Sequence, residues 1–172
     1  MDIVSGSDVD LALLLLRVLV GVTFSLHGFQ KLFGWFGGGG LDGTAAWFRG
    51  LGFGTGRAAA VLAGSGEIAG GLGLALGLLT PLSAAAMAGT MTTAALVNNA
   101  EAGFWSVDKG WELNGYLIVV ALSVAVAGPG TYSLDHLLGL TGWSGPVIGG
   151  AAILLGVLGG WARWATRQRD PG

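Results

Sequence analysis

The chain has 172 residues, of which 52% are hydrophobic and only 10% are charged, and it contains no cysteine. Because a soluble domain is about a quarter charged, this composition argues against a soluble enzyme, and eight basic residues leave no patch for nucleic acid. The lack of cysteine excludes thiol and disulfide chemistry carried by the chain itself. The 34 glycines follow no Gly-X-Y period, and such a content is typical of closely packed membrane helices. We therefore expect a small polytopic membrane protein.

Five apolar runs approach the length of about 20 residues that a bilayer-spanning helix needs. They predict helices over residues 11–33, 58–79, 81–97, 113–127 and 146–165. Residues 1–10 carry three aspartates and no Lys or Arg, so the first run is expected to be a retained helix and not a signal peptide. Pro81 suits the first turn of the third helix. The fold class is thus all-α: an integral membrane helical bundle with a four-helix core and a fifth C-terminal transmembrane helix.

Two connections are expected to carry short helices. In residues 34–56, glycines form a bend, and Asp42 or Thr44 is placed to cap an interfacial helix. In residues 128–138, a Gly-Pro-Gly break precedes Ser133, which is expected to cap a short amphipathic turn. Trp and Tyr residues gather near the predicted helix ends, as in the aromatic belts of membrane proteins.

The Lys and Arg residues predict the orientation of the bundle. With five spans, all but one of them fall on one side, and Arg17 lies within the first helix. By the positive-inside rule, the N-terminus is then outside and the C-terminus is cytoplasmic. With four spans, the C-terminal arginines would lie on the opposite side and the bias would vanish.

Three ionisable residues interrupt the apolar runs, and such residues are functional candidates because they are costly in a bilayer. Arg17 is expected to snorkel or to form a salt bridge. His27 and Glu67 are expected about 9 and 13 Å below the same membrane surface. Lys31 shares a face with His27, and the neighbouring helix ends add further polar groups: Asn98, Asn99 and Glu112.

The gathering of these polar residues in one half of the membrane-spanning bundle suggests a binding site for a quinone head group. A histidine beside a carboxylate can exchange protons near neutral pH. We therefore assign His27 and Glu67 as candidate catalytic residues, and Lys31, Asn98, Asn99 and Glu112 as candidate cofactor-binding residues. The alternative is a purely structural role, in which a His27–Glu67 hydrogen bond only holds two helices together.

Other patterns are less specific. Gly66-x-x-x-Gly70 and Gly73-x-x-x-Gly77 are close-packing motifs, which favour burial of Glu67. No glycine motif follows a strand, so no dinucleotide site is expected. With two histidines expected at opposite surfaces, neither haem nor a metal is expected.

Several blocks of the sequence occur together in one family. The string from His27 through Gly-Phe-Gln-Lys-Leu-Phe-Gly-Trp-Phe is followed by Gly64-Ser-Gly-Glu-Ile-Ala-Gly-Gly-Leu, Leu79-Thr-Pro-Leu and Gly128-Pro-Gly-Thr-Tyr-Ser-Leu-Asp. In order and spacing these blocks resemble the DoxX family, small bacterial inner-membrane proteins with a four-helix core, over about residues 10–140.

The resemblance implies a redox association. Some members of that family look like a subunit of a thiosulfate:quinone oxidoreductase, and others partner soluble sulfur-handling or superoxide-detoxifying enzymes. This chain departs from the pattern by an extra apolar segment after about residue 143, and by Asn98-Asn99 where many relatives have a histidine-bearing helix end. We accordingly divide it into a DoxX-like membrane domain, 1–140, and an additional helix with a basic tail, 141–172.

Three functions remain open at this point. The first is a redox membrane subunit of the bacterial inner membrane that binds quinone and couples it to a protein partner, because the chain supplies no electron carrier of its own. The second is a membrane anchor or scaffold, whose basic tail docks a partner or anionic lipid. The third is a small proton-coupled transporter, which with so few spans would require a homo-oligomer.

Overall fold

The computed structural model describes residues 5–168, apart from the side chain of Asn99, and within them the chain is all-α with no strand. Each of the five predicted runs is a helix, which confirms the fold class. The α-helices are α1 (Gly6–Phe33), α2 (Gly40–Gly50), α3 (Gly56–Leu76), α4 (Thr80–Ala94), α5 (Glu112–Ala127), α6 (Leu134–Leu137) and α7 (Pro146–Ala165). A π-helical turn, Ala95–Asn99, continues α4, and 3-10 turns occur at Trp35–Gly37, Ala100–Ala102, Ser106–Asp108 and Thr141–Trp143.

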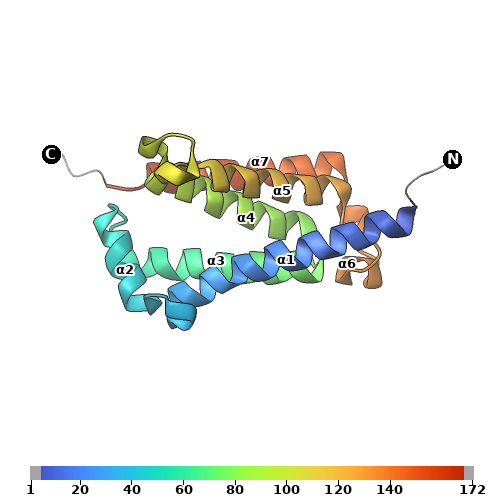
Figure 1. Ribbon diagram of the computed structural model, residues 1–172, viewed down its shortest axis with the longest axis horizontal. Helices are drawn as coiled ribbons and strands as arrows, with labels where there is room; N and C mark the ends of the chain where they lie inside the picture. The colour runs from blue at the N-terminus through green and yellow to red at the C-terminus, as the bar shows by residue number, and fades with distance from the viewer. Residues whose placement is uncertain (1–4, 169–172) are drawn as a thin grey trace.

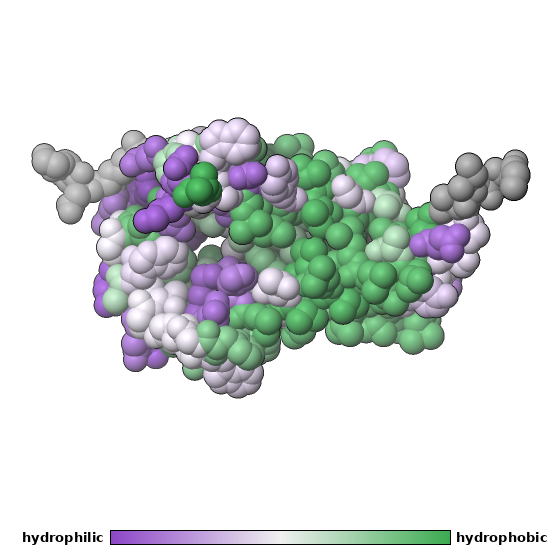
Figure 2. All heavy atoms as spheres, viewed as in Figure 1, coloured by the Kyte–Doolittle hydropathy of each residue, from purple (hydrophilic) through white to green (hydrophobic). Residues whose placement is uncertain are grey.

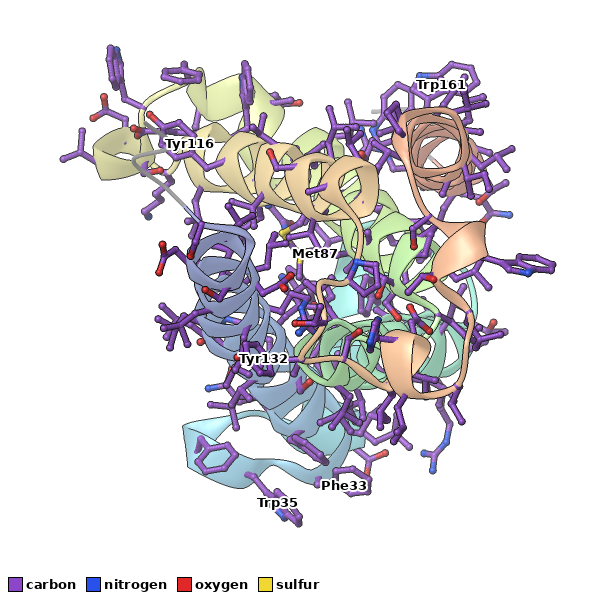
Figure 3. All side chains as sticks on the ribbon, turned by 90° about the vertical axis from the view of Figure 1, so that its right-hand side faces the viewer. Phe33, Trp35, Met87, Tyr116, Tyr132 and Trp161 are labelled. Carbon is purple, nitrogen blue, oxygen red and sulfur yellow. The ribbon has the colours of Figure 1, made fainter. Side chains whose placement is uncertain are left out.

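The five long helices form two layers that run along the long axis of the molecule (Figure 1). One layer contains α1, α3 and the short α2; in the other, α4 packs on α5 and α7. The layers meet through α3 and α4. Their shared core is apolar and includes Phe24, Leu74, Met87, Val124 and Ile153, all buried. Figure 3, seen from the α6 end, shows Met87 in the middle of the bundle.

Glycines bring the helices of each layer into close contact. A Cβ at Gly21 would lie 2.5 Å from the carbonyl oxygen of Gly71, so α1 and α3 touch backbone to backbone. Gly156 and Gly160 of α7 lie in the same way against α4. The expected motifs in α3 behave differently: Gly70 and Gly73 face α4, whereas Gly66 is open, with only the Thr90 hydroxyl within 4 Å.

The outer surface of the bundle is apolar over most of its length. Figure 2 shows this on the face that carries α1 and α5, with hydrophilic residues gathered at the α2 end. Three helices, α1, α3 and α7, are long and apolar enough to cross a membrane. The apolar helix α5 has 16 residues, about 24 Å at 1.5 Å per residue, and α4 is lengthened by its π-helical turn. The chain is therefore a helical membrane protein.

At the end where α1 begins, the loop after α5 closes the bundle. Arg17 is fully buried and donates to the carbonyl oxygen of Tyr132, 2.6 Å away. Asp10 instead binds the amide and hydroxyl of Thr131. The expectation that Arg17 snorkels or forms a salt bridge was wrong for the described residues, because the loop folds back over α1 and supplies the Tyr132 carbonyl as an acceptor, while α3 supplies that of Ala75. Ser133 caps α6 through the amide of His136, as predicted.

At the opposite end of the bundle, α2 lies next to the ends of α1 and α3. It begins at Gly40 with no side-chain cap, so the predicted capping by Asp42 or Thr44 was wrong. Asp42 lies in the first turn, and Thr44 donates to the carbonyl oxygen of Lys31. That bond holds α2 against the end of α1 and sets the floor of the site described next.

Candidate functional site

A cavity of about 500 Å³ lies between the two layers near the α2 end. Its volume is in the range of small-molecule sites. Side chains of α1 and α3 form one wall, those of α4, α5 and α7 form the other, and α2 with the following loop closes the end. Most of the lining is apolar or small, and the polar exceptions are few: His27, Lys31, Glu67, Thr90, Thr93, Asn98, Asn114 and Arg163.

The most buried charge in the cavity is the carboxylate of Glu67. Its side chain is 3% exposed, and the ammonium of Lys31 donates to both of its oxygens, at 2.6 and 2.7 Å. Gly28 packs against Ile68, so His27 is level with Glu67 and Lys31 lies one turn nearer the end of α1. The long lysine side chain therefore reaches back into the bundle to neutralise the carboxylate.

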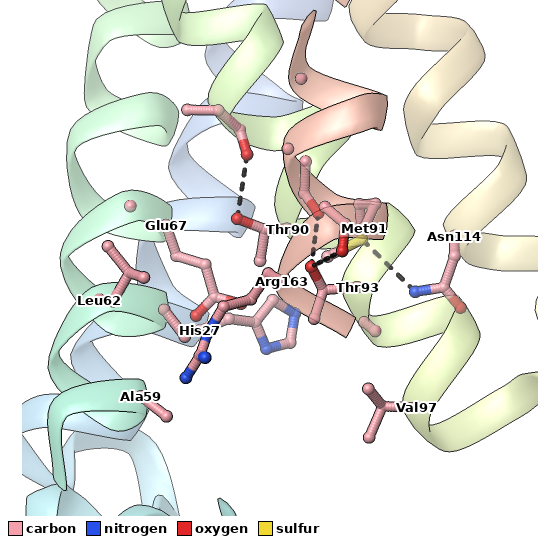
Figure 4. A pocket seen from close by; sticks show the side chains of 18 of the residues that line it. His27, Ala59, Leu62, Glu67, Thr90, Met91, Thr93, Val97, Asn114 and Arg163 are labelled. Carbon is pink, nitrogen blue, oxygen red and sulfur yellow. Dashed lines mark hydrogen bonds between the residues drawn. The ribbon is translucent and has the colours of Figure 1, made fainter. Parts of the chain in front are cut away.

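His27 lines the same cavity but makes a different bond. Its Nδ1 lies 3.1 Å from the Oε1 of Gln30, and no hydrogen bond joins it to Glu67 within the described part of the chain. The expected His27–Glu67 hydrogen bond was therefore wrong: the imidazole bonds Gln30 of its own helix, and Lys31 is the partner of the carboxylate. Figure 4 shows the imidazole and the carboxylate side by side on one wall of the cavity. The ring is left with Nε2 to offer to a ligand.

The facing wall carries hydroxyls and amides. Thr93 and Asn114 lie across the cavity from His27 (Figure 4). The Thr93 hydroxyl donates to backbone carbonyls of α4 and α7, and Asn114 contacts the sulfur of Met91 at 3.6 Å. Thr93 can therefore only accept from a bound molecule, whereas Asn114 can still donate to one.

The remaining predicted site residues are placed as follows. Asn98 lines the cavity at its polar end. The side chain of Asn99 lies outside the part of the chain that the structure describes. Glu112 does not line the cavity: its carboxylate accepts from the amide of Ser106 and so fixes the Ser106–Asp108 turn.

Arg163 is a site residue that sequence reasoning missed. It comes from α7, lines the cavity, and holds its guanidinium 4.5 Å from the centre of the Phe53 ring, a cation–π contact. The sequence signal was present, because Arg163 ends an otherwise apolar run, but it was assigned to a basic tail. The packing of α7 on α4 is what brings it to the cavity.

The arrangement suits an amphipathic ligand whose polar end carries hydrogen-bonding oxygens. A neutralised ion pair, an imidazole and amides can bind polar oxygens, while the apolar walls accept a ring. Among the described residues, no three His, Asp or Glu side chains come together to hold a metal ion.

The comparisons with known proteins give one finding. The DoxX family model matches residues 12–100, which is more than half of the chain and runs from α1 past the end of α4. That range contains His27, Lys31 and Glu67, whereas Asn114 and Arg163 lie beyond it. Comparison with curated proteins and with solved structures gave no match.

Proposed function

Because the chain belongs to the DoxX family, we propose that it is the membrane subunit of a redox system and that its cavity binds the head group of a quinone. The observation that carries this proposal is the position of the Lys31–Glu67 ion pair beside His27, at the wall of an apolar cavity inside a membrane protein. Ionisable groups in such a place are costly and mark functional pathways.

Each polar residue has a role that its chemistry allows. Because Nδ1 donates to the Gln30 amide oxygen, His27 donates from Nε2 to one quinone carbonyl only as the imidazolium, which can then pass on that proton. The Lys31–Glu67 pair holds a proton donor and a proton acceptor next to that ring. On the facing wall, the amide of Asn114 can donate to the second carbonyl, since the single hydroxyl proton of Thr93 is held by backbone carbonyls. His27 and Asn114 are thus the binding groups for the two ends of one ring, with the Lys31–Glu67 pair beside His27.

The electrons must come from outside the chain. A quinone becomes a quinol by taking up two electrons and two protons. The chain has no cysteine, and His27 and the Lys31–Glu67 pair exchange only protons. We therefore propose a partner protein with its own redox cofactor, bound at the α2 end of the bundle, the end near which the cavity lies.

The test is extraction of lipids from the protein purified in mild detergent, with quinone measured by mass spectrometry. Wild type should carry quinone, and His27→Ala and Glu67→Gln should each lose most of it. Glu112→Gln is the matched control, because Glu112 lies outside the cavity while Gln can still accept the Ser106 bond. Partner proteins recovered in the same purification identify the electron donor.

Two results would favour the other candidates. If wild type carries no quinone and the variants recover the same partners, the polar residues only hold helices together and the chain is an anchor or scaffold. If reconstituted vesicles show proton-coupled flux that Glu67→Gln abolishes, the chain is a transporter.

A further inference from the structure

The cavity reaches the surface of the bundle on two sides, and the two openings differ in polarity. One lies between α1 and α5, where His27, Asn98 and Asn114 line it. Figure 2 shows a hollow on this face at the hydrophilic end. The other lies between α3 and α7, and its lining is apolar except for Thr90 of α4 and Arg163 near the end of α7.

The α3–α7 opening joins the bilayer to the buried carboxylate. Leu62 of α3 and Leu155 of α7 line the same cavity as Glu67, yet they are 62% and 69% exposed on the outside of the bundle, whereas Glu67 is 2% exposed. Both leucines lie in helices that are long and apolar enough to span the membrane. A molecule in the bilayer core can therefore reach Glu67 without passing through water.

The walls of this opening leave room for a chain. Its floor is α4, which presents Ala86, Gly89 and Thr90 to the cavity. A Cβ at Gly66 of α3 would meet only the Thr90 hydroxyl at 3.8 Å, and one at Gly159 of α7 would meet nothing within 4 Å. The opening is thus bounded by small residues on its floor and walls, and the Arg163 side chain extends from α7 towards α3 at its polar end (Figure 4).

The end of the cavity nearest the basic surface is closed. Trp47, Phe48 and Phe53 line it there. The amide of Gln168 donates to the carbonyl oxygen of Gly52, 2.8 Å away, which ties the α2–α3 loop to the end of α7. The apolar tail of a ligand therefore cannot leave the cavity at that end.

We propose that a quinone with a polyprenyl tail enters from the bilayer between α3 and α7, and that its tail stays in this opening while the head group lies beside Glu67. The proposal rests on the proposed function and names the ligand class more closely. The polar α1–α5 opening then remains available as the path by which protons reach the head group.

The test compares two quinones that share a ring, one with a long polyprenyl tail and one without. Binding to the detergent-solubilised protein is measured by quenching of tryptophan fluorescence, since Trp47 lines the cavity. Gly159→Phe places a ring in the α3–α7 opening. Gly150→Phe is the control, because Gly150 lies in the same helix, has equal space and does not line the cavity.

Detergent solvates a polyprenyl tail about as well as the α3–α7 opening does, so placing the tail in the opening adds little to the binding free energy. The expected effect of Gly159→Phe is therefore a steric one. We expect about tenfold weaker binding of the tailed quinone, or about 1.4 kcal/mol, with the tail-less quinone bound as in wild type and Gly150→Phe unchanged for both. Equal binding of the tailed quinone by Gly159→Phe and wild type would overturn the lateral route, and so would equal weakening of both quinones. If wild type binds neither quinone, the proposed function itself fails.

Discussion

The carboxylate of Asp135 accepts hydrogen bonds from both the amide and the hydroxyl of Thr80, at 2.9 and 2.7 Å. It also accepts from the amide of Leu79, while its own amide donates to the carbonyl oxygen of Gly77. The residue that caps α4 is thus 55 positions away in sequence. This bond set fastens the α5–α7 connection to the α3–α4 turn and ties the two layers together at the end opposite the cavity.

Replacing Asp135 by Ala should destabilise the bundle. The buried amides at the start of α4 lose their acceptor, and loss of such a cap costs about 0.5–2 kcal/mol, with more for each buried donor left unpaired. We expect a loss of about 2–3 kcal/mol in the free energy of unfolding in detergent. Asp135→Asn keeps one oxygen acceptor and should lose less.

Asp42→Ala is the control for this prediction. Asp42 pairs with Arg57, but both side chains are exposed, at 92% and 67%, and such pairs contribute little. Its stability should change by less than about 0.5 kcal/mol. If both variants unfold like wild type, the Asp135 bonds do not hold the layers together.

The sequence was sufficient to predict the helices, because their position depends on local features. Runs of apolar residues near 20 long, Pro81 in a first turn and Ser133 before a short helix each determine structure over a few residues. The concentration of polar residues in one half of the bundle followed from helix lengths alone.

The partners of those polar residues could not be predicted in the same way. Glu67 binds Lys31 and not His27 because glycine contacts set the register of α1 on α3, and because lysine is long enough to reach one turn back. Arg163 reaches the cavity only through the packing of α7 on α4. Both facts depend on contacts between helices, which no local pattern encodes.

The Lys31–Glu67 pair should show strong energetic coupling. Removing one partner leaves the other charge uncompensated in a largely apolar site, whereas removing both leaves neither. In a double-mutant cycle with Lys31→Met and Glu67→Gln, we expect the double variant to be at least about 1 kcal/mol more stable than the sum of the single effects predicts. Stabilities from thermal or denaturant unfolding in one detergent provide the measurement. Additive effects would mean that the ion pair contributes no stability.

The orientation of the bundle can be tested with single cysteines, because the chain has none of its own. Val107 lies at the basic end and is 90% exposed, and Gly142 lies at the opposite end in an exposed turn. The excess of Lys and Arg predicts that the Val107 end is cytoplasmic. An impermeant maleimide should therefore label Gly142→Cys in intact cells and Val107→Cys only after permeabilisation. The reverse pattern would place the C-terminus outside.

Two glycines of α7 should respond to alanine with opposite signs, which tests whether α7 is an integral part of the bundle. A Cβ at Gly156 would overlap the carbonyl of Ala85 on α4, so Gly156→Ala must push the helices apart and should lower stability by about 1–3 kcal/mol. A Cβ at Gly150 meets nothing within 4 Å. Gly150→Ala should therefore show only the helix preference of alanine over glycine, a gain of about 0.5–1 kcal/mol.

Since Arg163 and Leu155 lie on the same helix, Gly156→Ala should also weaken quinone retention. If both the stability and the quinone retention of Gly156→Ala equal those of wild type, the cavity does not depend on α7.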